Sequence, residues 1–226
     1  MDKFIVENWG VVDYQSAYER QRALVEEVIT GGPQRLVFCE HPPVLTLGRM
    51  FDPESLIYTR DDILSQGVSI VPVDRGGDVT LHAPGQLVVY IIADLNRHGR
   101  DLRRYLEHLE QVAVDLLKDF DILAMGIAGK RGVFVPTFRQ KSLESGSRQS
   151  ETIVGISSQK IVSIGVGVRK WVTYHGLGIN VNTDLSLFNL IKPCGLSVQM
   201  TSMQKLLGRP GNMEDVQAAF VNHFKI

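Results

Sequence analysis

The sequence lacks the features that mark several large protein classes. It holds only two cysteines in 226 residues, and their spacing suggests no zinc site, redox motif or disulfide framework. Its 24 Lys and Arg against 25 Asp and Glu give a formal charge of −1, so no overall positive field favours nucleic acid. No apolar run reaches the roughly 20 residues of a membrane span, and the Met-Asp start lacks the regions of a signal peptide. We therefore expect a cytoplasmic protein without a nucleic-acid, membrane or metal partner.

The sequence does have the composition of an ordinary globular protein, with 44% hydrophobic and 22% charged residues. Its hydrophobic period changes between two and about 3.6 and nothing repeats, which predicts an α+β fold in a single domain over 1–226. Helices are predicted over 13–30, 101–120, 201–207 and 213–224. Strands are predicted over 35–39, 44–47, 69–73, 79–82, 86–92, 132–135, 152–157, 161–168 and 172–182, with a loop over 136–151.

A strand-turn-strand segment from Arg75 to Gln86 is the first candidate for a binding loop. Its glycines allow positive φ and let the backbone approach a ligand closely. Arg75 adds a fixed charge, and His82 adds a titratable donor or acceptor. A hairpin turn with a surface arginine and a packed histidine would explain the same residues, and the segment alone does not decide between the two interpretations.

Glycines also mark two later strands, which lie near 160–168 and 173–180. A strand glycine has no side chain to pack, so several of them leave room for a ligand or another backbone. No helix follows Gly165 and Gly167, which rejects a dinucleotide-binding fingerprint. Lys160, at the head of the first strand, is either a charge at a strand end or a functional amine.

Of the two cysteines, Cys194 is the candidate for a working thiol. It lies between Pro193 and Gly195 in an expected turn, whereas Cys39 lies inside an apolar strand and is expected in the core. A nucleophilic thiolate needs a neighbouring base or cation. The sequence offers three candidates for that neighbour, namely Lys160, His82 and His175.

Taken together, these segments resemble the octanoyltransferases of lipoate biosynthesis, which move an octanoyl group from acyl carrier protein to a lysine of a lipoyl domain. The resemblance spans most of the chain, and it is made specific by Lys160 and Cys194 following the Arg75 block. The other matching segments are the helix with Tyr14, Glu40-His41-Pro42-Pro43, Thr46-Leu47-Gly48-Arg49, His175-Gly176-Leu177 with Asn180, and Pro193-Cys194-Gly195.

The resemblance implies a role for each matching residue. Cys194 would carry the acyl group as a thioester, and Lys160 would favour the thiolate and shuttle protons. Backbone N–H groups near Gly76–Gly77 or Gly195 would stabilise the oxyanion. The implied substrate contacts are Arg75, Gly76, Gly77, Asp78, Val79, Thr80, Leu81, His82, Ser163, Ile164, Gly165, Gly176, Leu177 and Gly178, with Val79, Leu81, Ile164 and Leu177 as walls of the acyl slot.

The resemblance also implies a fold, partners and a surface. The fold is that of lipoate and biotin protein ligases, a mixed and largely antiparallel sheet flanked by helices, with a smaller second sheet. The partners are octanoyl-acyl carrier protein, lipoyl domains of 2-oxoacid dehydrogenase complexes and the glycine cleavage H protein, and the enzyme is a monomer without a cofactor. Such partners are typically acidic, which predicts a local basic surface. Its candidates are Arg97, Arg100, Arg103 and Arg104, or else Arg49, Arg169 and Lys170.

Two positions depart from the family pattern, and three other functions stay open. Phe134 replaces a common tryptophan and Gly178 a common alanine, which puts the preferred chain length in doubt. An ATP-dependent lipoate or biotin ligase would share the fold but would not need Cys194. A carrier-binding module would keep the fold without the chemistry, and an amidotransferase would move octanoyl between lipoyl-bearing proteins with a similar thiol.

Overall fold

The computed structural model describes residues 4–140, 153–192 and 198–226, without the side chains of 138–140 and 153–156. Its largest feature is a mixed sheet of eight strands. Seven strands follow the order β1 (Ile5–Val11), β2 (Arg35–Glu40), β6 (Gln86–Ile92), β10 (Val172–Asn180), β9 (Ile153–Arg169), β8 (Lys130–Gln140) and β7 (Met125–Ile127), and β11 (Gln199–Met200) pairs with β9. Among the strand pairs of the large sheet that the structure describes, only β1–β2 and β9–β11 are parallel, so this sheet is mainly antiparallel.

A second, smaller sheet has the order β4 (Ser69–Pro72), β3 (Val44–Leu47) and β5 (Val79–His82). β3 pairs in parallel with β4 and antiparallel with β5. Its apolar side chains form a separate core with Ile63 of the short helix α2 (Arg60–Ser65) and Phe188 of the 3-10 helix η3 (Leu185–Leu190). Two further 3-10 helices are η1 (Pro53–Ser55) and η2 (Leu95–His98). The predicted α+β class with a smaller second sheet is confirmed.

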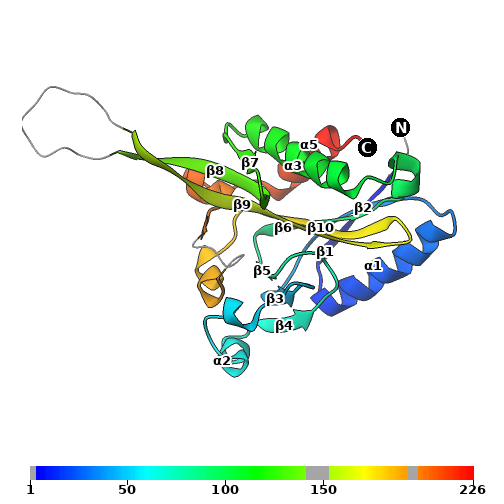
Figure 1. Ribbon diagram of the computed structural model, residues 1–226, viewed down its shortest axis with the longest axis horizontal. Coiled ribbons are helices and arrows are strands. Elements are labelled where there is room, and N and C mark those ends of the chain that lie inside the picture. The colour runs from blue at the N-terminus through cyan, green and yellow to red at the C-terminus, as the bar shows by residue number, and fades with distance from the viewer. Residues whose placement is uncertain (1–3, 141–152, 193–197) are drawn as a thin grey trace, which may run out of the picture.

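Helices cover both faces of the large sheet. The helices α3 (Leu102–Asp119) and α5 (Met213–His223) lie on one face, and α1 (Tyr14–Ile29) lies on the other (Figure 1). Successive side chains of β2 point to opposite faces of the sheet, which explains this arrangement. Phe38 joins the core with α3 and α5, while Val37 packs with Ala17 of α1. α4 (Met203–Leu207) follows β11.

An aspartate caps the N-terminus of each of the two long helices. An Asp13 carboxylate oxygen accepts the Ser16 N–H at 3.0 Å, and an Asp101 oxygen accepts the Arg104 N–H at 2.9 Å. Each bond satisfies a backbone donor that the first turn of a helix leaves unpaired. The same capping signal therefore fixes where α1 and α3 start.

The structure also differs from several expectations. β1, α2, β7 and β11 were not predicted, and the strands expected at 152–157 and 161–168 are parts of one strand, β9. The loop expected over 136–151 is wrong for residues 136–140, which belong to β8, and the rest of that prediction lies outside the described residues.

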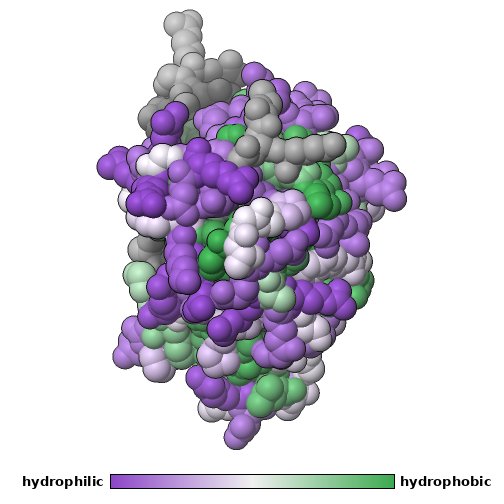
Figure 2. Space-filling view, turned by 90° about the vertical axis from the view of Figure 1, so that its right-hand side faces the viewer, coloured by the Kyte–Doolittle hydropathy of each residue, from purple (hydrophilic) through white to green (hydrophobic). Residues whose placement is uncertain are grey.

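The surface is predominantly polar on the face that Figure 2 shows, where hydrophobic residues appear in small scattered groups. Among the helices that the structure describes, none combines the length and the apolar character needed to cross a membrane.

Candidate active site

A cavity of about 360 Å³ lies between the large sheet and the small sheet. Its walls come from β5, from β6, β9 and β10, and from the loop that precedes β5. Leu102 and Leu106 of α3, Phe188 of η3 and Met200 of β11 add apolar surface. Such a mainly apolar cavity with a few polar groups is typical of a small-molecule site.

The residues predicted as site residues meet in this cavity, with two exceptions. Leu81 is fully buried in the core of the small sheet and does not line the cavity. Cys194 lies outside the described residues, so its neighbours stay a prediction. The predicted residues that line the cavity are Arg75, Gly76, Gly77, Asp78, Val79, Thr80, His82, Lys160, Ser163, Ile164, Gly165, Gly176, Leu177 and Gly178.

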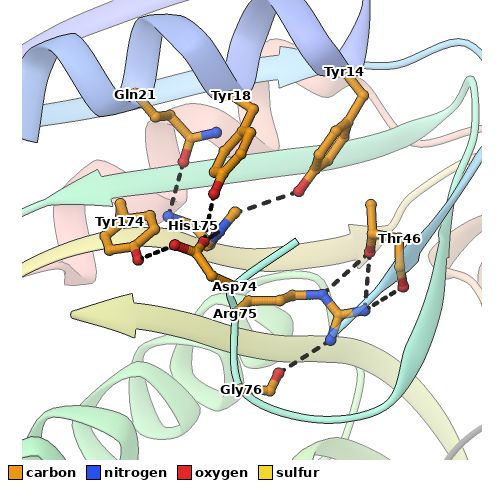
Figure 3. A network of polar contacts seen from close by, with 9 residues as sticks. All are labelled: Tyr14, Tyr18, Gln21, Thr46, Asp74, Arg75, Gly76, Tyr174 and His175. Atoms are coloured by element: carbon orange, nitrogen blue, oxygen red, sulfur yellow. Dashed lines mark hydrogen bonds and ion pairs between the residues drawn. The ribbon is translucent and has the colours of Figure 1, made fainter. Parts of the chain in front are cut away.

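Arg75 holds the loop before β5 in place. Its guanidinium donates to the Thr46 hydroxyl at 3.1 Å from Nε, to the Thr46 carbonyl at 2.7 Å from Nη2, and to the Gly76 carbonyl at 3.0 Å from Nη1 (Figure 3). The Gly76 N–H donates to the Val166 carbonyl at 2.9 Å, which ties the loop to β9. This N–H is therefore already paired, which leaves Gly77 and Gly195 as the oxyanion donors to consider.

Two glycines let this loop lie close to the strands. A Cβ built on Gly165 would lie 3.0 Å from the Gly76 carbonyl oxygen, and one on Gly48 would lie 2.2 Å from the Gly77 carbonyl oxygen. Side chains at either position would push the loop away from β9 or β3. Gly165 of β9 thus makes room for another backbone, one of the two uses that the sequence suggested for its strand glycines.

Asp74, next to Arg75, binds three donors from two other elements. The Tyr18 hydroxyl of α1 donates to it at 2.7 Å, and the Tyr174 hydroxyl of β10 at 2.6 Å. The His175 Nε2 lies 3.2 Å away and completes the network in Figure 3. Partial burial opposes ionisation, but the hydrogen bonds from His175, Tyr174 and Tyr18 hold the pKa of Asp74 well below its usual range. Burial and the Asp74 bond raise the pKa of Tyr18 to about 12.

His175 is a buried, neutral imidazole in a constrained backbone conformation. The backbone φ of His175 is +58°, and its backbone N–H donates to the Gln21 side-chain oxygen at 2.8 Å. Because Nε2 faces the Asp74 carboxylate, the ring proton belongs on Nε2, and Nδ1 faces the Tyr14 hydroxyl at 3.4 Å. Burial lowers the pKa of His175 despite the carboxylate.

His82 is a buried imidazole that burial keeps neutral, and Gln86 fixes which of its ring nitrogens carries the proton. The Gln86 amide nitrogen donates to the Leu81 carbonyl and the Asn180 side-chain oxygen, so its own oxygen faces His82 Nδ1 at 2.6 Å and accepts that proton. Burial, with neighbouring positive charge, lowers the pKa of His82 to about 3. A Cβ on Gly178 would lie 2.8 Å from this Gln86 oxygen. Glycine at position 178, where the family commonly has alanine, therefore leaves room for the Gln86 side chain.

His41 was not predicted as a site residue, although it adjoins the lining residues His82 and Tyr90. Its Nδ1 donates to the Val12 carbonyl at 2.7 Å, so Nε2 accepts the Tyr90 hydroxyl at 2.6 Å. Burial lowers the pKa of His41 to about 4. Tyr14 packs against both histidines, with ring centroids 5.1 Å from His41 and 5.7 Å from His82, and the two histidine rings lie 5.8 Å apart. Three neutral histidines thus lie together at one side of the cavity.

Lys160 lies within β9 and not at a strand end. It pairs with Phe134 of β8 on one side and Met200 of β11 on the other, and its carbonyl accepts the Thr201 N–H at 2.9 Å. The β8–β9 register shifts next to Lys160, and such irregularities re-aim side chains beside active sites. The side chain is buried against the cavity, with Nζ 5.7 Å from the Phe134 ring centroid.

Phe134 does not line the cavity. The replacement of tryptophan at this position therefore concerns the contact with Lys160 and not the wall around an acyl chain. Of the predicted basic residues, Arg97 pairs with Asp94 and Arg103 with Glu107, whereas Arg49 lines the cavity.

The Asp74 network predicts a stability effect. Replacement of Asp74 by asparagine is expected to lower the free energy of unfolding by about 1–3 kcal/mol, because an amide cannot accept all three hydrogen bonds. Urea denaturation at neutral pH measures this loss in the free energy of unfolding. Asp61→Asn, at an exposed site in the first turn of α2, is the control. Equal losses in the two variants would contradict the importance of the network.

The comparisons agree with this geometry at the level of family and fold. The lipoyl protein ligase A/B catalytic domain matches residues 13–225, so the chain belongs to that family. A lipoate-protein ligase A structure bound with ATP superposes with a TM-score of 0.71 at 16% identity, over 99% of this chain and 84% of that one. A biotin protein ligase from Aquifex aeolicus superposes with a TM-score of 0.52 at 13% identity, over 99% of this chain and 68% of that one. The predicted ligase-like fold is confirmed.

The sequence identity to octanoyltransferases, one class of enzyme within the family, is much higher than the identity to these ligases. The octanoyltransferase of Syntrophotalea carbinolica is 40% identical over 222 residues, which are 97% of this chain and 92% of that protein. The octanoyltransferase of Solibacter usitatus is 40% identical over 217 residues, which are 95% of this chain and 88% of that protein. The chain is thus a member of the octanoyltransferases, as its motifs predicted.

Proposed function

We propose that this chain transfers an octanoyl group from acyl carrier protein to a lysine of a lipoyl domain, through a thioester on Cys194. The observation that carries the proposal is a buried amine, Lys160, in the same cavity as the glycine-rich loop and the apolar walls. The octanoyltransferase relatives support the reaction. The targets we propose are lipoyl domains of 2-oxoacid dehydrogenase complexes and the glycine cleavage H protein, and the working unit is a monomer.

The cavity suits an acyl chain. Ile164, Val166 and Leu177 line it from β9 and β10, and Leu102 and Leu106 from α3. Each methylene removed from water contributes about 0.8 kcal/mol, so an eight-carbon chain gains several kcal/mol of binding. Discrimination between neighbouring chain lengths is modest for the same reason.

The first step exchanges one thioester for another. The Cys194 thiolate attacks the carbonyl carbon of the octanoyl thioester, and the carbon–sulfur bond to the pantetheine arm breaks. The departing thiolate takes up the proton that Cys194 gave to Lys160. Backbone N–H groups of Gly77 or Gly195 stabilise the oxyanion. No ATP is needed, because the bond formed is of the same kind as the bond broken.

The second step forms an amide. The neutral amine of the target lysine attacks the carbonyl carbon of the Cys194 thioester, and Lys160 takes up the proton that this nitrogen loses as the amide forms. The carbon–sulfur bond breaks, and Cys194 leaves as a thiolate. An amide is more stable than a thioester, so this step drives the transfer.

An ATP-dependent ligase is the rival function. The ligase structures share only 13–16% identity with this chain, so that likeness concerns the fold alone. The 40% identity to octanoyltransferases extends over nearly the whole chain. This difference favours transfer from a carrier over activation of a free acid.

An intact-protein mass spectrum after brief incubation with octanoyl-acyl carrier protein, without ATP, tests the proposal. We expect one octanoyl adduct that hydroxylamine removes and that Cys194→Ser lacks. Cys39→Ala is the matched control, because burial raises the pKa of the Cys39 thiol and keeps it unreactive. Acylation that appears only with ATP and free octanoate would instead establish the ligase.

A further inference from the structure

We propose that Gly132 is a positioning residue for Lys160, an inference that rests on the proposed function of Lys160. Gly132 lies in β8, beside the part of β9 that carries the lysine. The Lys160 chain passes through the space that a side chain at position 132 would fill. The missing Cβ thus sets the direction in which the amine enters the cavity.

The space at Gly132 is occupied by one specific side chain. A Cβ built there would lie 2.6 Å from Lys160 Cε and 3.3 Å from Nζ. It would also lie 2.5 Å from the Val162 carbonyl oxygen of β9. The φ of Gly132 is +120°, a conformation that favours glycine. Both the backbone and the neighbouring lysine therefore require glycine here.

Glu110 of α3 fixes this part of β8. Its Oε1 accepts the Gly132 N–H at 3.0 Å and pairs with Arg131 Nη1 at 3.2 Å. The Glu110 side chain is 16% exposed, so these charge-assisted bonds are partly shielded from water. Gly132 is thereby tied to the helix that supplies Leu102 and Leu106 to the cavity.

Phe134 makes a second contact with the lysine. Its ring centroid lies 5.7 Å from Lys160 Nζ, within the range of a cation–π contact. Gly132 and Phe134 are two residues apart, on either side of the register shift opposite Lys160. The amine thus lies close both to the space left by Gly132 and to the Phe134 ring. A proton acceptor must lie within about 3.2 Å of the group that it deprotonates, so small displacements of the amine matter.

The test compares Gly132→Ala with Gly129→Ala. Gly129 also has positive φ, at +78°, but a Cβ there meets nothing within 4 Å, so it controls for backbone strain alone. The first readout is the NMR signal of the Lys160 Cε group, assigned by its loss in Lys160→Met. The second is the kcat and KM of octanoyl transfer. We expect Gly132→Ala to shift the signal and lower kcat by about 100-fold with little change in KM, while Gly129→Ala does neither.

Glu110→Ala serves if Gly132→Ala does not fold. It releases the Gly132 N–H without adding an atom near Lys160, and alanine suits a helix. We expect the same signal to move, with a smaller loss of kcat. An unmoved Lys160 signal in the folded variants would overturn the inference. A moved signal with unchanged transfer would support the positioning by Gly132 and overturn the proposed role of Lys160.

Discussion

Replacement of Lys160 by methionine is expected to lower octanoyl transfer by about 1000-fold or more while leaving the protein folded. Removal of a general acid–base group costs 10²–10⁴-fold, and the same amine is proposed to favour the Cys194 thiolate. Methionine is apolar, flexible and of similar length, and its sulfur packs well against an aromatic ring such as Phe134. The loss should therefore be chemical and not structural.

Single-turnover measurements resolve the two proposed roles of Lys160. In Lys160→Met, both formation of the acyl-enzyme and its reaction with a lipoyl domain should be slow. Lys160→Arg keeps the charge but cannot act as a base, so it should form the acyl-enzyme faster than Lys160→Met and still fail at amide formation. Lys130→Met, at an exposed site at the start of β8, is the control. Near-normal transfer by Lys160→Met would remove Lys160 from the mechanism.

The parts of the fold that the sequence predicted well have strong local signals. The Asp13 cap placed the start of α1, an apolar stripe placed α3, and β-branched runs between glycines and prolines placed β4, β5 and β6. β1 was missed because it is an edge strand with both faces largely exposed, which leaves no alternation to detect. β9 was divided in two because the polar run 158–160 interrupts its apolar pattern, although pairing with β8 and β11 continues across that run.

The candidate site shows the same limit. Sequence motifs identified three of the segments that line the cavity, but they did not separate Leu81, which faces the core of the small sheet, from its neighbours. Alternation along β5 could have separated Leu81 from Thr80 and His82, since neighbouring side chains point to opposite faces. The contacts of Asp74 with Tyr18 and Tyr174 join residues 56 and 100 positions apart. No local pattern reports such contacts.

Acidification from pH 7.5 to pH 5 is expected to lower the free energy of unfolding by about 4 kcal/mol through His41 and His82 alone. Their pKa values in the folded protein, about 4 and about 3, lie below the value of 6.5 expected in the unfolded chain. Between these values the unfolded chain binds more protons, so stability falls as the pH falls below 6.5. Burial lowers the pKa of His175 as well, which acts in the same direction.

Urea denaturation at the two pH values measures this loss, which is large against a typical total of 5–15 kcal/mol. His82→Gln should be less stable than the parent at pH 7.5 but should lose about 2 kcal/mol less on acidification, because one titrating group is gone. Tyr14→Phe is the matched control. It removes a hydroxyl from the same cluster without removing a histidine, so the pH dependence should persist. Equal stability of the parent at pH 7.5 and pH 5 would show that these imidazoles are not held neutral by the fold.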